Sequence, residues 1–193
     1  MNTHRISIAA GVLVFALVAC TKNEEAVTET TATTVTSPAG EASPPPPANL
    51  TPGDREFAEK AARMGMAEVQ LATNVSNRAA SPDVRAFAQK MLEDHNRSNQ
   101  ELTALASQKG IDPPADLDPE HKALDEELAK LTGAALDKRY MEAMVKDHAT
   151  ASQEFEAASQ QLADADLKAW AAKTVPVLHQ HHQMADDIMK KLQ

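Results

Sequence analysis

Four long segments, each with apolar residues at intervals of three and four, limit most strongly how this chain can fold. They cover about residues 52–80, 82–109, 133–162 and 165–192. This spacing places apolar side chains on one face of a helix, whereas strands would show an alternating pattern that the chain lacks. Helices of roughly 28 residues are about 40 Å long at 1.5 Å per residue. The sequence therefore predicts an all-α fold, an antiparallel four-helix bundle.

The connections between these segments indicate the topology of the bundle. Thr51-Pro52 and Ser81-Pro82 have the form of helix starts, with a capping hydroxyl before a proline. Gly110 ends the second helix, and residues 112–131 form a proline-containing connection with a short amphipathic helix. A connection of this length can cross the bundle lengthwise. We therefore expect a ferritin-like bundle with a long connection between its second and third long helices.

The first 20 residues have the features of a bacterial signal peptide. Arg5 precedes an apolar run from Ile6 to Ala19, which is shorter than the roughly 20 residues of a membrane-spanning helix. Leu17-Val18-Ala19-Cys20 resembles a lipobox, and Cys20 is the only cysteine, which excludes an internal disulfide. We expect residues 1–19 to be a signal peptide and Cys20 to carry a lipid. The alternative is a cleaved signal with an incidental Cys20, followed by free secretion.

Residues 20–50 predict a disordered tether between this anchor and the bundle domain of residues 51–193. The segment is rich in Thr, Ser, Pro and Ala and has almost no large apolar residues. The formal net charge of −9 argues against nucleic acid or anionic lipid as a partner. Membrane attachment is thus expected through the lipid alone. Thr21, rather than Asp, after the cysteine favours the outer membrane of the bacterial cell envelope, with the domain facing the periplasm.

Each predicted apolar stripe is interrupted near mid-helix by one strongly ionisable residue. These residues are Glu68, His95, His148 and His181. Mid-helix positions lie level with one another whichever way the helices run, so the four side chains can converge in the core. One carboxylate and three imidazoles are ligands that suit zinc, copper, iron or manganese. The sequence therefore predicts a site for one transition-metal ion, and it does not show whether the protein is an enzyme.

Other interpretations of these residues remain open. A buried glutamate can hydrogen-bond to a protonated histidine without any metal, as expected for a structural or stress-related envelope protein with an unknown protein partner. Asp94 and Asp147 each precede a histidine and can orient a ligand or pair elsewhere. His179 and His182 can bind a metal at the surface, independently of the core. The chain contains no glycine-rich phosphate loop or nucleophile elbow.

Several segments resemble the signature of domain-of-unknown-function family 4142. They are Gly65-Met66-Ala67-Glu68, Met91 to His95, Met144 to His148 and Pro176 to His181, and the resemblance covers about Asp54 to Leu192. It implies an envelope protein with a ferritin-like bundle and no established activity. Di-iron ferritins carry Glu-x-x-His pairs, whereas Leu92, Val145 and Leu178 stand three positions before the three histidines. A mononuclear site fits better than a di-iron site.

Overall fold

The computed structural model describes residues 50–112 and 114–193, and these form five α-helices without a β-strand. The helices are α1 (Pro52–Ser76), α2 (Pro82–Gln108), α3 (Pro119–Lys130), α4 (Gly133–Gln161) and α5 (Ala165–Lys191). The all-α prediction is confirmed. Four of the helices are long, and the short amphipathic helix expected in the connection is α3, so the described fold has five helices in all. The predicted signal peptide, Cys20 and nearly all of the tether lie outside the described residues.

Carboxylates hold both ends of the first hairpin. Thr51 and Asp54 form a capping box at the start of α1, and Asp54 also accepts hydrogen bonds from the backbone N–H groups of Ala163 and Asp164. At the other end, Asp137 of α4 accepts the N–H groups of Ala80 and Ser81, at 2.9 and 2.6 Å. These two hydrogen bonds fix a turn after α1. The helix consequently ends at Ser76, four residues earlier than its apolar pattern predicts.

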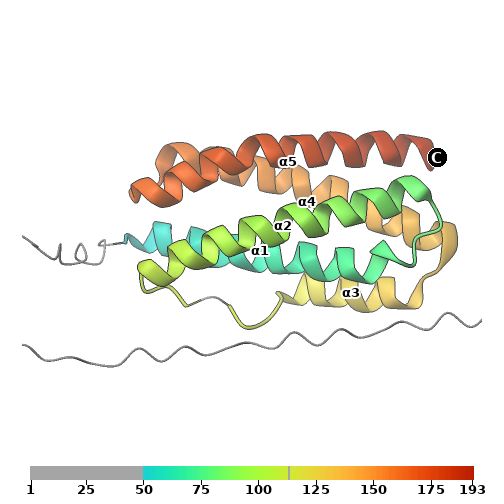
Figure 1. Cartoon of the computed structure of the whole chain (residues 1–193), viewed down its shortest axis with the longest axis horizontal. Coiled ribbons are helices and arrows are strands. Elements are labelled where there is room, and N and C mark those ends of the chain that lie inside the picture. Colours follow the sequence, from blue (N-terminus) through green and yellow to red (C-terminus); the bar gives the residue numbers. More distant parts are fainter. Residues whose placement is uncertain (1–49, 113) are drawn as a thin grey trace, which may run out of the picture. The chain divides into compact units, whose positions relative to one another are not determined.

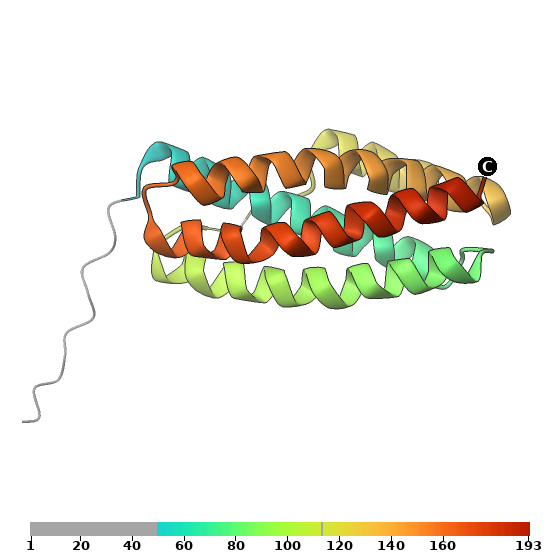
Figure 2. The same ribbon diagram turned by 90° about the horizontal axis from the view of Figure 1, so that it is seen from above.

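The long helices form two hairpins, α1 with α2 and α4 with α5, which pack against each other (Figures 1 and 2). The segment containing α3 runs from the end of the bundle where α2 finishes to the end where α4 begins (Figure 1). The expected lengthwise crossing is thus present. α3 lies along α1, where Asn74 donates to the Asp125 carboxylate at 2.9 Å. Among the described helices, none is long and apolar enough to cross a membrane.

The core consists of two apolar clusters separated by a polar layer. One cluster includes Leu71, Phe87, Tyr140 and Ile188, and the other includes Ala61, Leu102, Phe155 and Trp170. In every long helix the change from one cluster to the other occurs around the interrupting ionisable residue. We call these four residues, Glu68, His95, His148 and His181, the polar layer. Apolar packing on both sides holds this layer at the middle of the bundle.

Candidate metal centre

Three histidines from three helices meet in the polar layer. One ring nitrogen from each of His95, His148 and His181 lies within 4.8 Å of those of the other two. The ring centroids are 5.3–5.8 Å apart. His148 and His181 are 1% and 0% exposed, whereas His95 is partly exposed. The structure therefore brings together the three imidazoles on α2, α4 and α5.

Hydrogen bonds fix which nitrogen of two rings carries the proton. The Nδ1–H of His148 donates to the carbonyl oxygen of Met144 at 3.0 Å, and the Nε2–H of His181 donates to the Asp94 carboxylate at 2.8 Å. The other nitrogen of each neutral ring, His148 Nε2 and His181 Nδ1, carries a lone pair. Both of these atoms and His95 Nε2 are buried without a hydrogen-bond partner in the described part of the chain. The site thus presents two unpartnered acceptors, on His148 and His181.

Burial keeps these imidazoles neutral. Desolvation lowers the pKa of His95 to about 3 and that of His148 to about 4. Burial also lowers the pKa of His181, although Asp94 acts in the opposite direction. At neutral pH the rings are therefore in the form that coordinates metal ions. Buried lone pairs need a partner, and a cation can satisfy several of them at once.

Glu68 lies at the edge of this cluster rather than among its ring nitrogens. Its Oε1 is 3.8 Å from Nδ1 of His148, and its Oε2 is buried without a partner in the described chain. Burial, together with the negative charge of Asp147, raises the pKa of Glu68 to about 8. In the metal-free protein this carboxyl group therefore carries a proton at neutral pH. The role of Glu68 as a ligand stays a prediction.

Asp94 supports the site from outside. It is 6% exposed, accepts the His181 N–H, and receives a hydrogen bond from Lys90 at 2.8 Å. Burial alone would raise the pKa of Asp94, but the hydrogen bonds from Lys90 and His181 outweigh it and lower this pKa to about 2. A carboxylate that holds the far nitrogen of a histidine is the usual support of a metal ligand. The sequence left two roles open for Asp94, and the structure has both: it contacts the candidate ligand His181, and it pairs with Lys90 and Arg97.

Sequence reasoning missed a second histidine site beside Glu68. His121, at the start of α3, lies between Asp118 and Asp147, and its Nε2 is 3.7 Å from the Asp147 carboxylate. These two carboxylates raise the pKa of His121 to about 9. The apolar pattern of the connection predicts only an amphipathic helix, although the spacing Asp118-x-x-His121 at a helix start is a visible signal. His179 is separate from this site and pairs with Glu156 on the surface.

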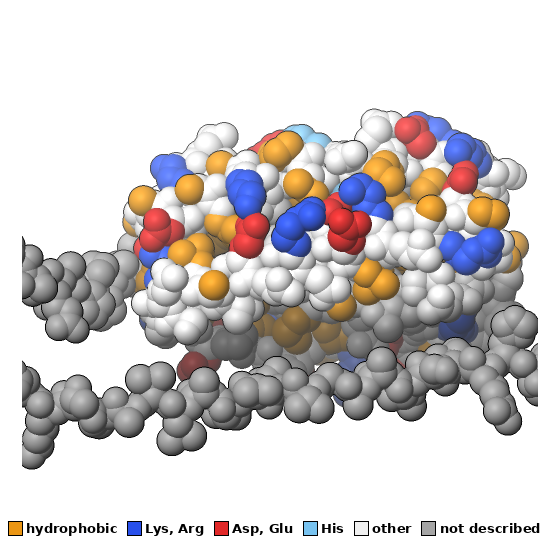
Figure 3. Space-filling model, in the orientation of Figure 1, with side chains coloured by type: hydrophobic (Ala, Val, Ile, Leu, Met, Phe, Trp, Pro, Cys, Tyr) orange, Lys and Arg blue, Asp and Glu red, His pale blue; other side chains and the backbone are white. Residues whose placement is uncertain are grey.

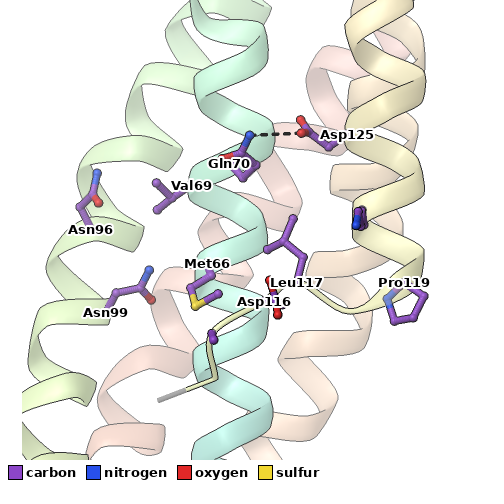
Figure 4. Close-up of a pocket in the computed structure, with 11 residues that line it drawn as sticks. Met66, Val69, Gln70, Asn96, Asn99, Asp116, Leu117, Pro119 and Asp125 are labelled. Carbon is purple, nitrogen blue, oxygen red and sulfur yellow. Dashed lines mark hydrogen bonds between the residues drawn. The ribbon is translucent and has the colours of Figure 1, made fainter. Parts of the chain in front are cut away.

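A larger cavity is separate from the imidazoles. It has a volume of about 970 Å³ between α1, α2, α3 and the segment before α3 (Figure 4). Its walls carry amides and carboxylates, with Gln70 donating to Asp125 at 3.1 Å, and no histidine. A cavity of about 30 Å³ lies instead beside Glu68, His95 and His148. Its volume is close to that of one water molecule, so it suits an ion better than an organic ligand.

Comparison with known proteins agrees with this fold. A DUF305 fragment from Deinococcus radiodurans superposes with a TM-score of 0.67 at 17% identity, covering 76% of this chain and 99% of that one. A DUF305 protein from Streptomyces coelicolor, named as a candidate secreted protein, gives 0.62 at 15% identity, covering 72% and 93%. Such identities establish a shared fold alone, and no curated protein matches the chain. The family described as "Domain of unknown function (DUF4142)" matches residues 39–188, so this chain belongs to the DUF4142 family.

Proposed function

We propose that this protein is a lipid-anchored component of the bacterial envelope that binds one transition-metal ion through His95, His148 and His181. The observation that carries this proposal is the convergence of three neutral imidazoles within 4.8 Å, with three buried ring nitrogens that have no hydrogen-bond partner in the described chain. His148 Nε2 and His181 Nδ1 both carry lone pairs, so they cannot hydrogen-bond to each other. A metal ion needs only the lone pairs that are present.

The chemistry of the ligands narrows the choice of ion. Three imidazoles with a nearby carboxyl group suit zinc, copper, iron or manganese, and nitrogen-rich sites favour the first three. Three histidines leave a fourth position in a tetrahedral site, which Glu68 or a water molecule can fill. Asp94 and the Met144 carbonyl already orient two of the rings. The site is therefore partly organised before the ion binds.

Metal analysis tests the binding function. Residues 21–193 are expressed without an affinity tag and purified without chelator, and bound metals are measured by mass spectrometry before and after dialysis. We expect about one equivalent of one metal. His95→Ala, His148→Ala and His181→Ala should each abolish that site, whereas His179→Ala and His182→Ala should leave it intact. A wild-type protein that neither retains nor takes up metal would favour the alternative, a structural envelope protein with a buried polar network.

The envelope location rests on the amino-terminal pattern that ends at Cys20. The name of the Streptomyces coelicolor relative supports a place outside the cytoplasm. Incorporation of labelled palmitate in a bacterial host tests the anchor. Wild-type protein should incorporate the label and fractionate with the outer membrane, whereas Cys20→Ser should do neither. Label in both proteins, or in neither, would contradict lipidation at Cys20.

A further inference from the structure

An acidic pocket lies outside the polar layer, between α1, α3 and α4. It has a volume of about 450 Å³, and we call it the outer pocket. In addition to Glu68 it is lined by six carboxylates: Glu56, Glu59, Asp118, Glu120, Asp147 and Glu154. Its three Lys and Arg residues each pair with one carboxylate, and His121 lies between two more. The outer pocket therefore keeps a negative charge that attracts cations.

Glu68 and Met64 border both the outer pocket and the small cavity beside the histidines. The Glu68 side chain is 9% exposed, and its Oε2 has no hydrogen-bond partner in the described chain. Its other oxygen, Oε1, is 3.8 Å from the His148 ring. A carboxyl group with one unpartnered oxygen thus stands between an acidic pocket and three inward imidazoles. This placement suits a group that takes a cation from one side and releases it to the other.

The opposite side of the layer offers a poorer approach. A cavity of about 60 Å³ between α2 and α5 reaches His95 and His181. The two basic side chains that line it are both paired: Lys173 pairs with Glu101 at 2.7 Å, and Arg97 pairs with Asp94. The charge of this cavity lining is therefore balanced. On the face that carries α2 and α5, acidic and basic side chains are interspersed (Figure 3). This side is narrower and has balanced charge, so it attracts a cation less.

From these observations we propose that the metal ion reaches the polar layer through the outer pocket and that Glu68 transfers it to the histidines. This inference rests on the proposed metal-binding function. It assigns the outer pocket to a hydrated divalent cation and makes Glu68 a positioning residue on the route. A charged pocket raises the rate at which a cation encounters the protein. A change of charge in the outer pocket should therefore alter the association rate of the metal ion more than the number of ions bound.

Stopped-flow mixing of the residue 21–193 protein with Co²⁺ tests the route, because cobalt absorbance reports coordination. Glu56→Lys changes an exposed residue of the outer pocket, and Glu101→Lys makes the same charge change beside the α2–α5 cavity. At low salt, Glu56→Lys should slow association roughly 3- to 10-fold, and high salt should remove most of this difference. Glu101→Lys should stay within about 2-fold of wild type. Glu68→Gln should slow the step even at high salt.

The outcomes separate the two proposals. If the wild-type protein gives no stoichiometric cobalt spectrum, the metal-binding function itself fails. If the wild-type protein binds but Glu101→Lys slows association as much as Glu56→Lys, the net charge of the protein explains the rates, and entry through the outer pocket is ruled out. If only Glu101→Lys slows it, the ion enters between α2 and α5. An unchanged rate in Glu68→Gln would remove Glu68 from the path.

Discussion

Single hydrogen bonds fix the tautomers of two histidine rings in the polar layer. The Met144 carbonyl and the Asp94 carboxylate each take one N–H, and each thereby leaves the other nitrogen with a lone pair. Neither contact involves the candidate ion. Small changes outside the cluster should therefore alter binding without removing a ligand, and a substitution of Asp94 tests this.

Asp94→Asn keeps the shape of the side chain and removes its charge. The amide orients His181 less firmly and makes it a weaker ligand, so metal affinity should fall by about 10- to 100-fold with the stoichiometry unchanged. Titration against a competing chelator measures this effect. Glu93→Gln, a matched change at an exposed neighbour, is the control and should bind as wild type does. Equal affinity in the two variants would mean that Asp94 does not support the site.

Glu68→Gln tests the buried proton. The pKa of Glu68 is about 8 in the folded protein against 4.5 as its ordinary value. Above pH 4.5 the unfolded chain releases a proton that the folded, metal-free protein keeps, so this group removes stability as pH rises from 4.5 to 8. Glutamine has no such proton. The variant should be more stable than wild type by about 2–4 kcal/mol at pH 9 and roughly equal at pH 4, as measured by urea unfolding. Equal stability at both pH values would show that Glu68 ionises freely.

At the scale of helices, α1 and α2 make one close contact at Gly65. A Cβ atom added at Gly65 would lie 1.9 Å from Oδ1 and 2.8 Å from Cγ of Asn99 on α2. Glycine in a helix interior reduces stability by about 1 kcal/mol relative to alanine, so its presence here has a packing reason. The contact lies three residues from Glu68 in the chain. Gly65 thus leaves room for the Asn99 side chain near the polar layer.

Gly65→Ala should lower the free energy of unfolding by about 1–2 kcal/mol, because Asn99 has to move out of its place. In a protein that also carries Asn99→Ala, the same substitution should instead stabilise by about 0.5–1 kcal/mol through helix propensity. Chemical unfolding of the four proteins in this cycle measures the change of sign. An identical effect in both backgrounds would show that the two residues do not clash.

The helices themselves could be predicted from sequence because each apolar stripe is long and regular. The end of α1 could not, since it depends on Asp137, a residue that approaches the turn from another helix. The mid-helix positions of the three histidines could likewise be read from the stripes. Helix rotation and packing decide three other features of the site. They are the contact of Asp94 with His181, the position of Glu68 at the edge of the histidine cluster, and the placement of His121 between Asp118 and Asp147. No pattern within a single helix contains that information.

Across the whole molecule, the three histidines link the two hairpins, since His95 belongs to the first and His148 and His181 to the second. An ion bound there adds a link between two hairpins that already meet through apolar packing and through the hydrogen bonds of Asp54, Asp94 and Asp137. At a free metal concentration 100 times the dissociation constant, binding adds about 2.7 kcal/mol of stability. Thermal unfolding should then occur roughly 5–12 °C higher than in the metal-free protein. His181→Ala should lose this shift, and a shift that persists in the variant would place the ion elsewhere.

The division of the core into two apolar clusters has a consequence for how the helices align during folding. Sliding one helix by a single turn, about 5.4 Å, would push its imidazole or carboxyl group among leucine and phenylalanine side chains and place an apolar residue in the layer. In coiled coils, a single buried polar position of this kind selects one register over its neighbours at some loss of stability. By the same reasoning, the polar layer favours one register of the four long helices. It selects the one longitudinal arrangement in which the three imidazoles face each other, and it does so before any ion is present.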